Sequence, residues 1–186
     1  GLGRWGSNYL RTLAALPGVR VAAVVDPSEE ARVRAASLVP HSRQFPSIGD
    51  ALAHAKVDGV VISSPSETHA GIAVTALEQG LAVLVEKPVA TTVRDAHALC
   101  RPEFAGKLLA GHLAVHHPAL QRIQSLVEHN AIGEVRQIAA NRASAGSTRS
   151  SESALWALGP HDACTVVRLL GSPSTVRCES RLPNEQ

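Results

Sequence analysis

GLGRWG, residues 1–6, decides the fold of this chain of 186 residues, because its glycines have the spacing GxGxxG and a helical pattern follows them at once. In such a loop the glycine at Gly1 permits a tight turn, Gly3 lets the backbone approach a pyrophosphate, and Gly6 lets the next helix pack on a sheet. The helix N-terminus then faces the phosphates. An apolar run ends in Asp26, twenty residues beyond Gly6, where a carboxylate would bind the ribose hydroxyls. The pattern predicts a dinucleotide site.

The acidic residue favours NAD over NADP, because a carboxylate accepts hydrogen bonds from both ribose hydroxyls and repels a 2′-phosphate. Arg32 or Arg34 would weaken this preference by lying close to the ribose. Arg4 and Trp5, inside the loop, belong to the predicted cofactor site. The alternative without a cofactor is a tight strand-to-helix turn at the glycines and an Asp-Pro turn at Asp26.

Helical and strand patterns alternate through the first part of the chain, which is typical of a parallel sheet covered by helices on both faces. The expected helices are residues 5–16, 28–38, 47–53, 68–79 and 92–100, and the expected strands are 19–25, 44–45, 57–63, 81–85 and 108–112. The predicted fold class is α/β, a Rossmann doubly wound parallel sheet in residues 1–112. Because residue 1 is already the first glycine, we expect the first strand to be missing and the chain to be a fragment that folds poorly alone.

The alternation changes after residue 112, which predicts a second domain over residues 113–186. We expect this domain to be an incomplete α+β substrate domain. Its expected elements are helices at 118–129 and 160–170, strands at 135–142 and 174–181, and a serine-rich loop at 143–152.

Composition excludes several classes of function. Basic and acidic residues are nearly balanced at 18 and 16, and aromatic residues make up 3% of the chain, so we expect no nucleic-acid partner. The sequence contains no apolar stretch long enough for a membrane span, so we expect no membrane partner. The three cysteines, Cys100, Cys164 and Cys178, form no CxxC pair, which indicates reduced cysteines in the core of a cytoplasmic protein.

Two loops follow predicted strands, at the edge where open parallel sheets bind ligands. Ser64 and Pro65 follow the strand at 57–63, and Glu86-Lys87 follows the strand at 81–85. Lys87 is the strongest catalytic candidate, because its ammonium would lie beside the nicotinamide. A lysine at a strand end, taken alone, is usually only solvated.

The chain resembles the Gfo/Idh/MocA oxidoreductases over almost its whole length. The motifs that carry the resemblance are GLGRWG (1–6), VVDP (24–27), SPSETHA (64–70), VEKPVATT (85–92), GHLAVHHPAL (111–120), IGEV (132–135) and HDACTVVRLLG (161–171). The resemblance implies hydride transfer between a nicotinamide and a secondary alcohol or ketone of a sugar. It assigns Lys87 to the reacting carbon, a cis bond to Lys87-Pro88, and the acid/base role to His161. It also implies a homo-oligomer, a dimer or tetramer. In the motif SPSETHA, we assign His69 to the cofactor site.

A finer resemblance concerns the substrate. The pattern NRxxxG at 141–146, Arg149 and LWALGPHD at 155–162 are similar to the subgroup of UDP-N-acetyl-sugar 3-dehydrogenases. The expected substrate-binding residues are His117, Arg142, Arg149, Trp156 and His161. Guanidinium groups bind anionic sugars and diphosphates in a bidentate way. A solvated strand edge and loop is the alternative for the two arginines.

The chain departs from the family pattern at several positions. Ala157 stands where many relatives have an aspartate, and Val115 and His116 replace the commoner arginine and aromatic residue. His112, His116 and His117 have no cysteine or carboxylate at a suitable spacing, so we expect no metal. The rival functions are an inositol or simple sugar dehydrogenase and a non-catalytic NAD-binding sensor or scaffold.

Overall fold

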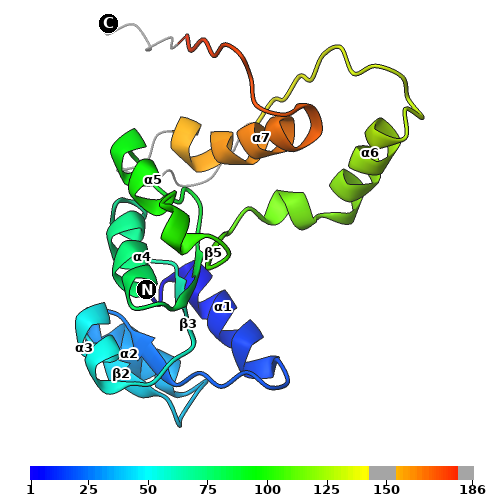
Figure 1. Cartoon of the computed structure of the whole chain (residues 1–186). Helices are drawn as coiled ribbons and strands as arrows, with labels where there is room; N and C mark the ends of the chain where they lie inside the picture. Colours follow the sequence, from blue (N-terminus) through cyan, green and yellow to red (C-terminus); the bar gives the residue numbers. More distant parts are fainter. Residues whose placement is uncertain (143–153, 180–186) are drawn as a thin grey trace, which may run out of the picture. The chain divides into compact units, whose positions relative to one another are not determined.

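The computed structural model describes residues 1–142 and 154–179. The chain divides into two compact units, Gly1–Gly111 and His112–Gln186. The first unit alternates helices and strands, whereas the described part of the second is helical (Figure 1).

The elements of the first unit follow the alternation that the sequence predicts. They are α1 (Arg4–Ala15), β1 (Ala23–Val25), α2 (Glu29–Ala36), β2 (Arg43–Phe45), α3 (Ile48–His54), β3 (Gly59–Ile62), η1 (Ser66–Thr68), α4 (His69–Glu78), β4 (Ala82–Val85), α5 (Val93–Leu99), η2 (Pro102–Phe104) and β5 (Leu108–Ala110). The strands are shorter than the apolar runs that contain them.

Hydroxyl side chains begin three of these helices. The hydroxyl oxygens of Ser28, Ser47 and Thr92 accept hydrogen bonds from backbone N–H groups in the first turns of α2, α3 and α5. Each bond satisfies one N–H group that has no partner inside the helix. Helix α4 ends before Gly80, whose φ of 80° lies in the left-handed region that glycine adopts without steric cost. The predicted helix starts and this helix end are confirmed.

The strands form two parallel sheets, β1-β2 and β3-β4-β5. In a doubly wound sheet, the strand that leads into the glycine loop lies between the strands that correspond to β1 and β3. Gly1 occupies the end of this position: its nitrogen donates to the Val25 carbonyl (3.0 Å), and its carbonyl accepts from the Ser63 hydroxyl (3.0 Å). The glycine loop therefore joins the carboxyl ends of β1 and β3.

Two apolar clusters form the core of the first unit. The larger cluster lies where α4 packs against β3 and β4, with α5 beside α4 (Figure 1). Ala73 and Ala76 on α4 are fully buried, and their small side chains let this helix approach the strands closely. The smaller cluster joins Leu10 of α1 to Val24 of β1, so the helix of the glycine loop is packed on the first sheet.

The described elements of the second unit are η3 (Leu113–His116), α6 (Pro118–Glu128) and α7 (Ala154–Leu170). Helix α7 differs from the prediction, because it begins six residues before Pro160 and contains this proline in its interior. A proline removes one intrahelical hydrogen bond. The preceding residues, ALWAL at 154–158, are mostly strong helix formers, so the helix continues through it.

The expected strands of the second unit are not observed. Residues 135–142 and 174–179 have no regular secondary structure, and the rest of the expected second strand lies outside the described residues. A strand exists only when a neighbour pairs with its N–H and C=O groups. Residues 112–142 and 154–179 contain no strand that would do so. The expected loop at 143–152 also lies outside the described residues.

The prediction that the cysteines lie in the core is wrong. All three thiols are free, as predicted, but Cys100 and Cys178 are exposed and Cys164 is half-buried. Cys100 follows the last residue of α5, at a helix end that faces solvent. Burial raises the pKa of the Cys164 thiol, and the charge of Arg168 opposes this shift. Among the described residues, no helix has the length and apolar character needed to cross a membrane.

Candidate active site

Steric contacts explain two of the three glycines in the loop. A Cβ at Gly6 would lie 2.0 Å from the Gly1 carbonyl oxygen, and a Cβ at Gly1 would lie 2.7 Å from Cα of Ser64. Both positions therefore require glycine for the fold itself. A Cβ at Gly3 would meet no atom within 4 Å. The structure thus leaves open space at Gly3, where the sequence predicts that a pyrophosphate approaches the backbone.

The first turn of α1 offers a binding site for an anion beside this space. Gly3 is the residue that precedes the helix, and it supplies no side chain to cap the N–H groups of the first turn. That turn also contains no acidic residue. Uncapped N–H groups and the positive end of the helix dipole favour a phosphate. The open cradle at Gly3 therefore fits the pyrophosphate of a dinucleotide, with Arg4 and Trp5 exposed beside it.

Asp26 connects the end of β1 to the glycine loop. Its Oδ2 accepts a hydrogen bond from the Leu2 N–H (2.7 Å), and its Oδ1 accepts one from the Ser28 N–H (2.9 Å). Each carboxylate oxygen has a second acceptor site. The carboxylate can therefore hold the loop and still accept a bond from a ribose hydroxyl.

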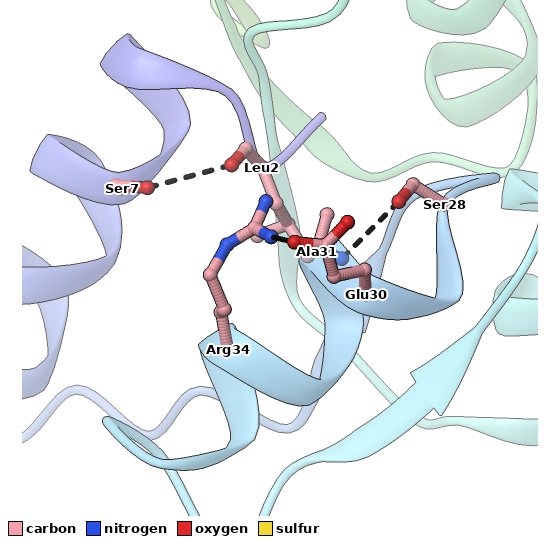
Figure 2. A network of polar contacts seen from close by, with 6 residues as sticks. All are labelled: Leu2, Ser7, Ser28, Glu30, Ala31 and Arg34. Atoms are coloured by element: carbon pink, nitrogen blue, oxygen red, sulfur yellow. Dashed lines mark hydrogen bonds and ion pairs between the residues drawn. The ribbon is translucent and has the colours of Figure 1, made fainter.

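The two arginines near Asp26 already have partners within the protein. The Arg32 guanidinium donates to the Asp26 and Pro27 carbonyl oxygens at 2.6 and 3.0 Å. Arg34 pairs with Glu30 one turn earlier in α2, at 2.5 Å (Figure 2). A 2′-phosphate would have to draw either guanidinium away from these partners. The arrangement is therefore consistent with the predicted preference for NAD.

His69 connects the loop after β3 to the turn after β4. The ring is 2% exposed, its Nε2 lies 2.8 Å from the Ser64 carbonyl oxygen, and its Nδ1 lies 2.8 Å from the Pro88 carbonyl oxygen. A neutral imidazole donates from one nitrogen only, so the tautomer determines which of the two carbonyl oxygens accepts a hydrogen bond from the ring. Because both nitrogens are used by the backbone, His69 would support the cofactor site by holding the two loops. The neighbouring Pro65 begins the short η1 turn.

The turn that contains Lys87 is built around a buried carboxylate. Glu86 is 7% exposed; its Oε1 accepts from the Tyr9 hydroxyl at 2.7 Å, and its Oε2 accepts from the Lys87 N–H at 3.1 Å. The peptide bond between Lys87 and Pro88 is cis, which confirms the prediction. Burial, the hydrogen bond to Glu86 and the charge of this carboxylate raise the pKa of Tyr9.

Tyr9 is a site residue that the sequence analysis missed. It is the one tyrosine of the chain, and it lies inside the helix that the sequence predicts at residues 5–16. The motif spacing contains no signal that its hydroxyl reaches a residue 77 positions away. Gly111 was missed for the same reason: a Cβ there would lie 3.1 Å from the Val85 carbonyl oxygen and 3.2 Å from Cα of Glu86, so this glycine lets the chain pass close to the end of β4.

The second unit contains the predicted substrate residues. The Nδ1 of His117 accepts from the Ala119 N–H (3.2 Å) and caps α6, which leaves Nε2 as the nitrogen that carries the proton in the neutral ring. Arg142 donates from Nε to Oδ1 of Asp162 at 2.6 Å, so its charge is paired beside His161. Trp156 and His161 belong to α7. Arg149 lies outside the described residues.

Residues 1–107 match the family model described as "Oxidoreductase family, NAD-binding Rossmann fold". The chain belongs to this Gfo/Idh/MocA family. Among the curated relatives, the chain is 34% identical to inositol 2-dehydrogenase 1 of Saccharopolyspora erythraea over 72% of its own length and 41% of the relative's. It is also 34% identical to UDP-N-acetylglucosamine 3-dehydrogenase of Acidithiobacillus ferrooxidans, over 67% of its own length and 39% of the relative's. The chain therefore spans about two fifths of the length of these family members.

A solved structure shows the same fold. The myo-inositol dehydrogenase of Corynebacterium glutamicum superposes with a TM-score of 0.64 at 28% identity, over 72% of this chain and 40% of the other. Membership of the Gfo/Idh/MocA family and the Rossmann fold, both predicted from the sequence motifs, are thereby confirmed. The assignment to the UDP-N-acetyl-sugar subgroup is not decided, since inositol dehydrogenases and a UDP-sugar dehydrogenase are both similar to the chain.

Proposed function

We propose that the protein is an NAD-dependent oxidoreductase that transfers a hydride between the nicotinamide and a secondary alcohol or ketone of a sugar or cyclitol. The observation that carries this proposal is the link between the two halves of the site in the first unit. Tyr9 belongs to the helix that begins at the open Gly3 cradle, and its hydroxyl contacts Glu86 in the turn that carries Lys87. A cofactor in the cradle would lie along the strand ends toward Lys87.

Oxidation of the alcohol removes a hydride from the carbinol carbon and a proton from the hydroxyl group. Bound NAD supplies the acceptor for the hydride that leaves the carbinol carbon. The hydroxyl proton needs a separate acceptor, and we assign it to His161, because imidazole titrates in the required range. Lys87 would hold the same oxygen and stabilise its developing negative charge. Lys87 belongs to the first unit and His161 to the second, and their cooperation is part of the proposal.

The finer substrate assignment has two candidates. The motifs around Arg142 and Arg149 favour a nucleotide sugar, whose diphosphate needs cationic partners. Arg142 forms an ion pair with Asp162, so the charge of this arginine already has a partner within the protein. This pairing favours a cyclitol or free sugar instead. The homo-oligomer and the cytoplasmic location that the sequence predicts are part of the same proposal and are not decided by the fold.

The decisive experiment measures NAD reduction at 340 nm by the full-length protein. The substrate panel contains UDP-N-acetyl sugars, their uronic acids, free sugars and inositols. Turnover with nucleotide sugars alone supports the UDP-sugar assignment, and turnover with free polyols alone supports the cyclitol assignment. NAD binding without turnover on any substrate would contradict the catalytic proposal and favour the sensor.

A lysine variant tests the catalytic assignment directly. Lys87→Ala should lower turnover at least about a hundredfold, because the transition-state oxyanion loses its cation, while NAD binds as in the wild type. Lys56→Ala is the matched control, since Lys56 is exposed in the same unit and lies outside the proposed site. Equal loss of NAD binding and turnover in Lys87→Ala would refute this role for the lysine.

A further inference from the structure

The carboxylate of Glu86 is enclosed within the first unit. Glu86 is 7% exposed, and Gly111 lies next to its carboxyl group, since a Cβ at Gly111 would be 3.4 Å from Cδ of Glu86. Burying a carboxylate costs several kcal/mol unless donors satisfy its oxygens. The Tyr9 hydroxyl and the Lys87 N–H each donate to one oxygen. The position of this carboxylate therefore depends on both donors.

The two hydrogen bonds form a continuous connection from α1 to the catalytic turn. Tyr9 donates to Oε1 of Glu86 at 2.7 Å, and Oε2 of the same carboxylate accepts from the Lys87 backbone at 3.1 Å. A carboxyl group is planar, so the bond to one oxygen restricts the orientation of the other. Without the tyrosine hydroxyl, Oε1 of Glu86 loses this donor, and rotation of the carboxyl group would weaken the bond to the Lys87 N–H.

We propose that Tyr9 is a positioning residue, which acts through Glu86 to hold the backbone of Lys87 in the orientation that hydride transfer requires. This inference rests on the proposed function, because it assigns the catalytic role to Lys87. Tyr9 does not contact the substrate in this proposal. It joins the helix that binds the cofactor phosphates to the turn that presents the lysine, so that both halves of the site keep one geometry.

The first test compares Tyr9→Phe with the wild-type full-length protein. The substitution removes one oxygen atom and retains the ring. We expect kcat to fall about tenfold, because small misplacements of a catalytic group have effects of this order, while the substrate KM and the Kd for NAD change less than about twofold. Thr12→Ala is the matched control: it removes an exposed hydroxyl of α1 that donates to the Asn8 carbonyl oxygen of the same helix. An unchanged kcat in Tyr9→Phe would overturn the proposal.

A double-mutant cycle separates positioning from general damage. If Tyr9 acts through Glu86, then Tyr9→Phe should have little further effect on kcat in a Glu86→Gln background. Two independent losses that multiply in the double variant would show that the tyrosine acts by another route and would refute the proposal. Glu86→Gln also provides the comparison if Tyr9→Phe melts below the assay temperature, because it should lower kcat with the same unchanged KM.

A measurement without substrate keeps this inference distinguishable from the proposed function. Hydrogen exchange of the peptide that contains Lys87, followed by mass spectrometry, reports the bond from its N–H group. We expect this peptide to exchange faster in Tyr9→Phe than in the wild type and in Thr12→Ala. Faster exchange in a protein that turns over no substrate of the panel would support the connection and refute the proposed function. Unchanged exchange refutes the connection whatever the activity.

Discussion

Substitution of Gly6 by alanine tests the steric reasoning about the glycine loop. The new Cβ would lie 2.0 Å from the Gly1 carbonyl oxygen and 3.0 Å from the Ser63 hydroxyl. The first turn of α1 must therefore move by about 1 Å, which is overpacking of a site closed by backbone. The movement also disturbs the hydrogen bond from Gly1 to the Val25 carbonyl.

The magnitude follows from these two effects. Overpacking costs about 1–3 kcal/mol, and loss of one hydrogen bond costs about 1 kcal/mol. The expected loss of unfolding free energy is therefore about 3 kcal/mol. In a protein of about 150–250 residues this loss lowers the Tm by about 6–12 °C. Glycine to alanine inside an ordinary helix has the opposite sign and stabilises by about 1 kcal/mol.

Two other glycines provide the controls for this experiment. Gly49→Ala lies in α3 with its Cβ 3.8 Å from the nearest atom, so it should be neutral or stabilising. Gly3→Ala meets no atom within 4 Å, so its stability should change by at most about 1 kcal/mol. Its methyl group would occupy the cradle, and we expect its NAD affinity to fall more than about tenfold.

The assays are thermal unfolding of the full-length protein without cofactor and titration calorimetry with NAD. A Gly6→Ala protein that melts with the wild type would refute the steric argument. Wild-type NAD affinity in Gly3→Ala would refute the assignment of the open space to the pyrophosphate. The two variants therefore separate a glycine required by the fold from a glycine required by the ligand.

Three further predictions follow from side-chain contacts. Asp26→Asn removes the charge that repels a 2′-phosphate, so the Kd ratio of NADP to NAD should fall about tenfold; equal ratios in both proteins, measured by titration, would contradict this role. His69→Leu removes the buried ring whose nitrogens lie 2.8 Å from the Ser64 and Pro88 carbonyl oxygens, so the unfolding free energy measured in urea should fall by about 2–4 kcal/mol, and wild-type stability would show that the ring is dispensable. Because folding raises the pKa of Tyr9, its protonated hydroxyl contributes stability that is fully present below pH 10.0, the ordinary pKa, and is lost as the pH rises toward the folded-state pKa. The difference in unfolding free energy between wild type and Tyr9→Phe should therefore shrink above about pH 10. A difference that grows with pH would contradict this prediction.

The second unit shows where prediction from the sequence failed. Pro160 indicated a helix start, but local propensity in the preceding residues extends α7 through it. The apolar pattern at 135–142 predicted a strand, but this stretch has no paired neighbour among the described residues. Whether such a pattern forms a strand depends on a partner elsewhere in the fold, and the local sequence contains no information about it.

The sequence by itself determined the starts of α2, α3 and α5, the alternation of helices and strands in the first unit, and the glycine loop with Asp26. These features depend on interactions within a few residues, such as the bond from the Ser28 hydroxyl to the Ala31 N–H. Only the tertiary structure decided that Tyr9 holds Glu86, 77 residues away, and that His69 joins two loops. Such contacts depend on how α1 and α4 pack against the strands, because packing brings together side chains whose separation in the sequence has no periodicity.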